Sequence, residues 1–181
     1  MLRNILTYGV IAGLIVGIPL FAMGVTLDHG HVGGAWGMVI GYTIMLVALT
    51  TVFVAVKRRR DVELGGVIRF WPAFGYGLAI STVAGLIYVL SWEAAMLFMD
   101  SSFAATYAQA TLDAARADGA SAAEMARLEA QMNDFVTMYA NPAMRIAMTF
   151  FMEFFPVGLL VSLISAALLR NSRFMPAQVT A

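Results

Sequence analysis

The stretch MTFFMEFFPVGLLVSLISAALL, residues 148–169, decides the fold class of this chain. Almost every side chain in it is apolar, and it is long enough to cross a bilayer, which takes about 20 such residues in a helix. The exception is Glu153. Because an ionised carboxylate inside a membrane helix costs roughly 2.5 kcal/mol or more, Glu153 must face protein, water or a partner, or else stay protonated. We therefore treat Glu153 as a candidate functional residue.

The composition of the whole chain extends this interpretation. Of its 181 residues, 61% are hydrophobic and only 12% are charged, whereas a soluble domain is about 25% charged. Segments at about 5–27, 35–56, 74–99 and 143–169 are each long enough to span a membrane. We interpret the first as a retained helix, because its apolar run exceeds the roughly 7–15 residues of a signal peptide. We predict an all-α integral membrane four-helix bundle, with residues 1–181 forming a single transmembrane domain.

The basic residues predict the orientation of the four spans. Eight of the eleven Lys and Arg residues fall at the two ends of the chain or between the second and third spans. By the positive-inside rule, both termini are expected in the cytoplasm, with the first loop and the long third loop outside. The basic cluster is interpreted as a lipid-facing group that contacts anionic head groups, rather than as a nucleic-acid site. Its members are Lys57, Arg58, Arg59 and Arg60.

Residues 101–140, between the third and fourth spans, predict further helix outside the membrane. Asp118 and Gly119 indicate a turn, and Ser121 and Glu124 have the spacing of a capping box. The apolar residues that follow recur at alternating steps of three and four, which is typical of a helix seam. We expect an extracytoplasmic helical hairpin or helical extensions of the two spans. The seam is expected to pack on itself or on the bundle, with a partner protein as the alternative.

Two rows of glycines resemble a glycine zipper. In each row the residues are four apart, so they share a helix face where backbones approach closely. The first row is expected to pack the first span against the second, and homodimerisation through one row is the alternative. The rows are Gly9, Gly13 and Gly17, and Gly33, Gly37 and Gly41.

The charged residues inside the third and fourth spans form a candidate polar site. Glu93 lies near the outer end of the third span and Arg145 near the outer end of the fourth, which predicts an ion pair. Glu153 lies about 15 Å into its span at 1.5 Å per residue. With Tyr88 and Trp92, these residues predict an outward-facing polar cluster. The function of this cluster is either that of a proton or ion relay or a polar ligand pocket, or that of an interhelical clasp. We favour the clasp or a dead-end pocket over a complete path across the membrane.

No catalytic set is recognisable, so the chain is not expected to be an enzyme. It lacks the phosphate-binding, zinc-protease, hydrolase and dinucleotide fingerprints, and it has no cysteine. His29 and His31, beside Asp28, are a weak metal candidate, because two His in a Gly-rich loop are usually only interfacial. We therefore expect no metal and no cofactor.

Three stretches of the sequence resemble a known family. Residues 60–74, 88–93 and 149–166, together with 6–9 and 139–142, are similar to the bacterial domain-of-unknown-function family 4199. The resemblance covers essentially the whole chain. It implies a four-span protein of the bacterial inner (cytoplasmic) membrane without an established activity. It also points to recurring residues as candidates, namely Arg60, Asp61, Gly66, Phe70, Trp92, Glu93, Glu153 and Pro156.

The leading functional hypothesis is a non-enzymatic accessory or interaction subunit. It rests on the outer hairpin with its apolar seam, on the glycine rows and on the missing catalytic set. The alternative is a small transporter or channel with Glu93, Arg145 and Glu153 in its pathway. The expected partners are membrane lipids and either a second copy of the chain or another membrane protein, with no nucleic acid.

Overall fold

The structure, a computed structural model, describes residues 1–26, 35–99 and 103–176. Within these ranges the regular structure is helical throughout, as the sequence predicted. The helices are α1 (Leu2–Thr26), α3 (Ala35–Arg58), α4 (Phe70–Met96), α5 (Phe103–Ala117), α6 (Ala122–Ala140), α7 (Pro142–Met148) and α8 (Phe155–Leu169), with π-helical turns η1 (Arg59–Glu63) and η2 (Thr149–Phe154).

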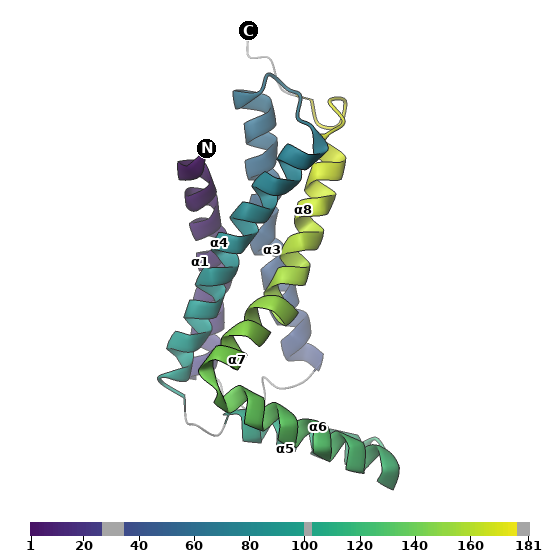
Figure 1. The fold of residues 1–181 in the computed structure, drawn as a ribbon. Helices are drawn as coiled ribbons and strands as arrows, with labels where there is room; N and C mark the ends of the chain where they lie inside the picture. The colour runs from purple at the N-terminus through teal and green to yellow at the C-terminus, as the bar shows by residue number, and fades with distance from the viewer. Residues whose placement is uncertain (27–34, 100–102, 177–181) are drawn as a thin grey trace.

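Four of the helical stretches are long and apolar enough to cross a membrane. They are Leu2–Val25, Val39–Glu63, Phe70–Met96 and Pro142–Leu169. The last combines α7, η2 and α8. Figure 1 shows the four stretches side by side, with the N-terminus and the end of α8 at the same end of the bundle. The expected four-helix membrane bundle is thus confirmed, although α4 begins at Phe70, four residues before the predicted start.

Helix α4 is the centre of the bundle, because it packs most extensively against both α1 and α8. Its contact with α1 uses the first glycine row. A Cβ on Gly9 would lie 2.6 Å from Val83, and one on Gly13 would lie 2.6 Å from Ile87, so only glycine permits this approach. Gly17 faces Ser91 in the same way. The expectation that this row packs against the second span is wrong, and its burial against α4 also removes it as a dimer interface.

The second glycine row does not form a matching contact. Gly33 lies outside the described residues, and so do the surroundings of Gly37. A Cβ on Gly41 would meet no atom within 4 Å. Close packing against another described helix of this chain therefore does not explain Gly41. Homodimerisation through this row stays a prediction.

The contact between α4 and α8 is built from small residues. A Cβ on Gly158 would lie 3.0 Å from the Cβ of Ser81, and one on Gly85 would lie 2.8 Å from the rings of Phe150 and Phe154. The hydroxyls of Ser81 and Ser162 lie 3.2 Å apart. This half of the bundle, nearer the termini, is closely packed.

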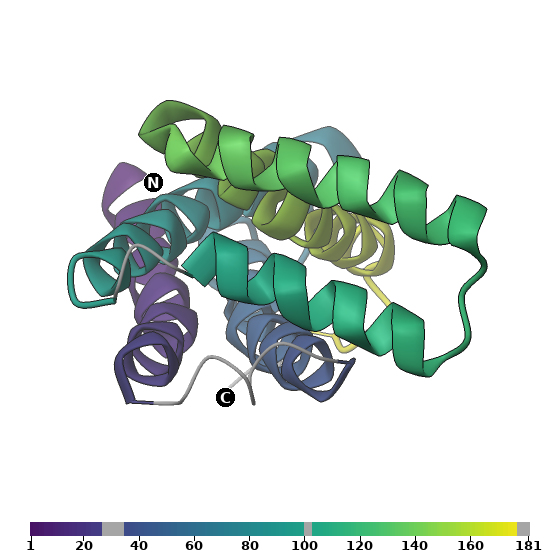
Figure 2. The ribbon, with the colours of Figure 1, turned by 90° about the horizontal axis from the view of Figure 1, so that it is seen from below.

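Helices α5 and α6 form the predicted hairpin, which lies across the other end of the bundle (Figures 1 and 2). Gly119, with a φ of +79°, makes the turn between them. The capping box of Ser121 and Glu124 begins α6. Asn141 ends α6 and also caps α7 by accepting hydrogen bonds from the amides of Ala143 and Met144.

Arg60 corrects the interpretation of the basic cluster. Its side chain is fully buried, so it does not face lipid. The π-helical turn η1 directs it inward, where Nη1 donates to the carbonyl of Phe174 at 2.9 Å and Nη2 to that of Met175. Nη1 also lies 3.5 Å from the carbonyl of Leu169, the last residue of α8. Arg60 therefore ties the chain that follows α8 to the negative end of that helix, where the carbonyl of Leu169 has no partner within the helix.

Candidate functional site

The fourth span changes from α-helix to π-helix where Glu153 lies. Pro156 has no amide hydrogen to donate to the carbonyl of Met152, and its ring obstructs that carbonyl. The wider turn η2 accommodates both defects, and α8 begins immediately after it at Phe155. The sequence predicted a kink here, and the structure places a π-helical turn at the same point. Such turns often occur at functional sites.

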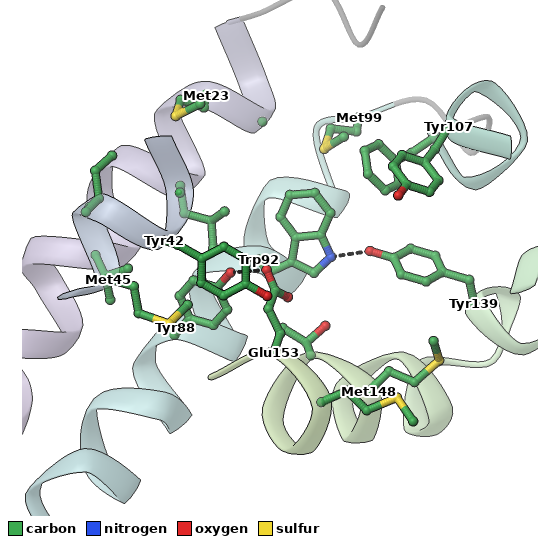
Figure 3. A pocket seen from close by; sticks show the side chains of 18 of the residues that line it. Met23, Tyr42, Met45, Tyr88, Trp92, Met99, Tyr107, Tyr139, Met148 and Glu153 are labelled. Atoms are coloured by element: carbon green, nitrogen blue, oxygen red, sulfur yellow. Dashed lines mark hydrogen bonds between the residues drawn. The ribbon is translucent and has the colours of Figure 1, made fainter. Parts of the chain in front are cut away.

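Glu153 meets Tyr88 at the middle of the bundle. The hydroxyl of Tyr88 donates a hydrogen bond of 2.7 Å to Oε1 of Glu153. Tyr88 is 4% exposed, whereas Glu153 remains exposed and lines a cavity. Figure 3 shows the carboxylate beside the rings of Tyr42 and Tyr88. No ion pair within the described ranges involves Glu153.

Glu93 and Arg145 form a separate ion pair nearer the hairpin. Nε and Nη2 of Arg145 donate to the two carboxylate oxygens of Glu93 at 2.7 and 2.6 Å. Nη1 donates to the carbonyl of Tyr139 at 3.2 Å. The indole N–H of Trp92 donates to the hydroxyl of Tyr139. The predicted polar cluster is thus divided into two separate groups. Glu93 and Arg145 form an ion pair, and Glu153 accepts a hydrogen bond from Tyr88.

Burial raises the pKa of the Tyr139 hydroxyl above its ordinary value of 10. The hydroxyl therefore stays neutral at physiological pH, and it accepts the hydrogen bond from Trp92 without carrying charge. The ring of Tyr139 stands against those of Phe103 and Phe135, with centroids 5.7 and 5.1 Å away. Tyr139 thus joins the hairpin to the end of α4.

A cavity of about 420 Å³ lies between the spans and the hairpin. Its lining comes from α1, α3, α4, α5, α6, α7 and η2, and it is mostly apolar or aromatic. Among the described residues that line the cavity, Glu153 is the one Asp, Glu, His, Lys or Arg. A cavity of this size, apolar with a few convergent polar groups, is typical of small-molecule sites. Figure 3 shows Trp92, Tyr139 and Glu153 around it.

The cavity is closed toward the chain termini. The ring of Phe154, which is 1% exposed, stands 5.3 Å from that of Tyr88. Beyond it, the apolar core is fully buried at Leu49, Val52 and Ile80. Together with the small-residue contact of α4 and α8, this packing ends the cavity at the level of Glu153.

One known protein family matches nearly the whole chain. The family described as "Protein of unknown function (DUF4199)" matches residues 7–171, which include the four spans and the hairpin. The chain belongs to this family. No curated protein and no solved structure matches it. The site in this DUF4199 protein must therefore be interpreted from its own geometry.

Sequence reasoning missed most of the cavity lining of this DUF4199 protein. Tyr42, Tyr107 and Thr149 line it, but each lies in a segment where aromatic or hydroxyl side chains are ordinary. Gly41 is also part of the lining, and its missing side chain leaves space rather than allowing helix contact. The burial of Tyr139 could have been predicted, because this residue continues the apolar pattern of three- and four-residue steps that follows Glu124.

The metal candidate cannot be placed, because Asp28, His29 and His31 lie outside the described residues. Within the described ranges, no group of three His, Cys, Asp or Glu side chains is arranged to hold a metal ion.

Proposed function

We propose that this DUF4199 protein is a non-enzymatic binding protein of the bacterial inner membrane that takes a small amphipathic molecule into the cavity at Glu153. The proposal rests mainly on the cavity of about 420 Å³, which reaches Glu153 and is closed beyond it by Phe154. A closed end favours binding over passage. The basic residues at the end of the bundle that carries the termini support a cytoplasmic position for that end.

The other functional hypotheses receive less support from the geometry. Nucleophilic catalysis needs a nucleophile activated by a neighbouring base, and the hydrogen-bond partner of Glu153 is the phenol of Tyr88. For a partner-binding hairpin, the apolar seam would have to be free, but Tyr107 and Phe135 pack together with centroids 5.5 Å apart and line the cavity. An accessory role thus loses its main sequence argument. Transport requires a second opening on the terminal side of Glu153.

Substituted-cysteine labelling tests the one-sided cavity, and the cysteine-free sequence makes each introduced thiol unique. Gly41→Cys places a thiol in the lining, and Ser162→Cys places one in the packed half, where Ser162 is fully buried. A membrane-impermeant thiosulfonate is expected to label Gly41→Cys from the hairpin side only, and Ser162→Cys from neither side. Labelling of Ser162→Cys from the terminal side would support transport instead.

Occupancy of the cavity is tested by native mass spectrometry of protein taken from its own membranes. A small-molecule adduct is expected on the wild type and not on Gly41→Leu, because the leucine occupies space that Gly41 leaves open. The matched control is Gly75→Leu, at another glycine with no atom within 4 Å and outside the cavity lining. An adduct retained by Gly41→Leu, or absent from the wild type, would count against the proposal.

A further inference from the structure

We infer that the ligand of the cavity is an organic cation with an apolar body, bound with its charge between the carboxylate of Glu153 and the surrounding aromatic rings. This inference rests on the proposed function, because it names the chemical class that the same cavity takes. Three observations carry it: an acid without an ion-pair partner among the described residues, a wall of aromatic rings, and a lining whose described hydrogen-bond donors are all uncharged.

The first observation is the charge balance around Glu153. The cation that the sequence placed near it, Arg145, is held by both oxygens of Glu93. No lysine or arginine stands among the described residues that line the cavity. Only Oε1 of Glu153 accepts a hydrogen bond among the described contacts, from Tyr88. A carboxylate at membrane depth is costly unless it is paired, so a cationic ligand supplies the partner that the protein does not.

The second observation is the aromatic wall. Tyr42, Trp92, Tyr107 and Tyr139 line the cavity from four different helices, and Figure 3 shows them around the space in front of Glu153. The faces of such rings attract cations by about 0.5–2 kcal/mol each, most strongly away from water. Aromatic side chains around a carboxylate therefore match a substituted ammonium group better than they match a neutral polar group.

The third observation concerns the donors that an anion would need. The N–H of Trp92 is donated to Tyr139, and the hydroxyl of Tyr88 is donated to Glu153. The hydroxyls of Tyr42, Tyr107 and Thr149 also line the wall and are neutral. The rest of the lining includes the thioethers of Met23, Met45 and Met99. These side chains adapt to apolar groups of varied shape. A neutral hydroxyl can donate to an anion, but the carboxylate of Glu153 repels it, and no lysine or arginine among the described lining residues offsets that charge. The cavity therefore suits a positively charged centre with an apolar body better than a carboxylate or phosphate.

The test uses two ions of matched size and shape, tetraphenylphosphonium and tetraphenylborate, with the full chain purified in a maltoside detergent that carries no charge. Binding is measured by isothermal titration against empty micelles. The phosphonium is expected to bind more tightly than the borate, and Glu153→Gln is expected to weaken the phosphonium by at least about tenfold. Tetrabutylammonium repeats the cationic arm with a smaller ion.

Glu129→Gln is the matched control, because Glu129 is exposed on α6 and lies 3.6 Å from Arg116, away from the cavity. It is expected to bind both ions like the wild type. Equal binding of phosphonium and borate, or a Glu153→Gln protein that binds the cations like the wild type, would overturn the cation inference. If Gly41→Leu then removed binding of both ions, the binding cavity would stand without a charge preference. If Gly41→Leu also bound both ions like the wild type, the proposed function would fail together with the cation inference.

The same chemistry has two natural sources, a free lipophilic amine or the head group of an amino phospholipid. Adding phosphatidylethanolamine to the micelles separates them, with phosphatidylglycerol as the lipid control. Competition by phosphatidylethanolamine alone identifies the head group as a ligand, and undiminished phosphonium binding identifies a free amphipathic cation. Either result supports the inference once the Glu153→Gln effect is present.

Discussion

Arg145 contacts both carboxylate oxygens of Glu93, at 2.7 and 2.6 Å. The pair joins the first turns of the fourth span to the last turns of α4, close to where the hairpin leaves the bundle. It also fixes the charge of Arg145 away from Glu153, two helical turns further on. A clasp and a separate acidic site thus arise from three residues that the sequence grouped together.

Breaking this pair is expected to destabilise the protein. Glu93→Gln or Arg145→Gln leaves one charge unpaired among side chains that are 22% and 12% exposed. Each change should cost about 3 kcal/mol, the low end for removing one partner of a buried pair. Unfolding by SDS in mixed micelles, followed by tryptophan fluorescence, measures the loss.

The double variant Glu93→Gln/Arg145→Gln is the internal control for this pair. Because no charge is then left unpaired, it should be more stable than the sum of the two single losses by at least about 1 kcal/mol. Arg127→Gln on the exposed surface of α6 should change little. Additive losses would show that the ion pair is not a coupled unit.

Arg60 is expected to hold the chain that follows α8. Arg60→Met removes hydrogen bonds to the carbonyls of Phe174 and Met175 and the contact with Asp61. It should cost about 3 kcal/mol, because partly buried acceptors and the carboxylate of Asp61 lose their partner. Faster amide exchange at residues 170–176 is the direct readout.

Two matched variants separate the geometry of Arg60 from its charge. Arg60→Lys keeps the charge but cannot reach several carbonyls at once, so it should restore only part of the protection. Arg58→Met, at an exposed position in the same cluster, should leave residues 170–176 protected. Equal effects at both positions would refute the specific role of Arg60.

The spans and the hairpin could be predicted because each depends on local pattern alone. Apolar length indicates a membrane helix wherever it occurs, and the capping box of Ser121 and Glu124 acts within one helical turn. The partner of the first glycine row could not be predicted in the same way. Gly9, Gly13 and Gly17 specify a helix face, but they do not specify which of three neighbouring helices lies against it.

The basic cluster and the cavity show a second reason why some features of the structure could not be predicted from the sequence. Lys57 and Arg60 are equivalent as charges in the sequence, but the π-helical turn η1 buries one of them and leaves the other partly exposed. The residues that line the cavity come from helices spread along the chain, from α1 to η2. No periodicity in the sequence indicates that Tyr42 lies near Glu153. The residues with an unusual chemistry could be identified, whereas their surroundings required the three-dimensional packing.

The capping box is expected to make the start of α6 sensitive to acid. Hydrogen bonds from the side chain and the amide of Ser121 lower the pKa of Glu124 below its ordinary value of 4.5. Because the unfolded state then binds more protons in this range, the stabilisation is complete above pH 4.5 and is lost as the pH falls through the lower, folded value. Amide exchange in the first turn of α6 should therefore accelerate below that pH beyond the intrinsic trend. Glu124→Gln, which keeps the box without a titrating group, should show the intrinsic trend alone.

The two glycine rows make opposite predictions for the same substitution. Gly13→Ala would place a Cβ 2.6 Å from the Cβ of Ile87, so α1 must move away from α4 at a cost of about 1–3 kcal/mol. Gly41→Ala meets no atom within 4 Å and should instead stabilise α3 by up to about 1 kcal/mol, through the better helix propensity of alanine. Unfolding in mixed micelles compares the two proteins directly. A loss of stability at Gly41 as large as that at Gly13 would mean that another helix, from this chain or from a second copy, occupies the space beside Gly41.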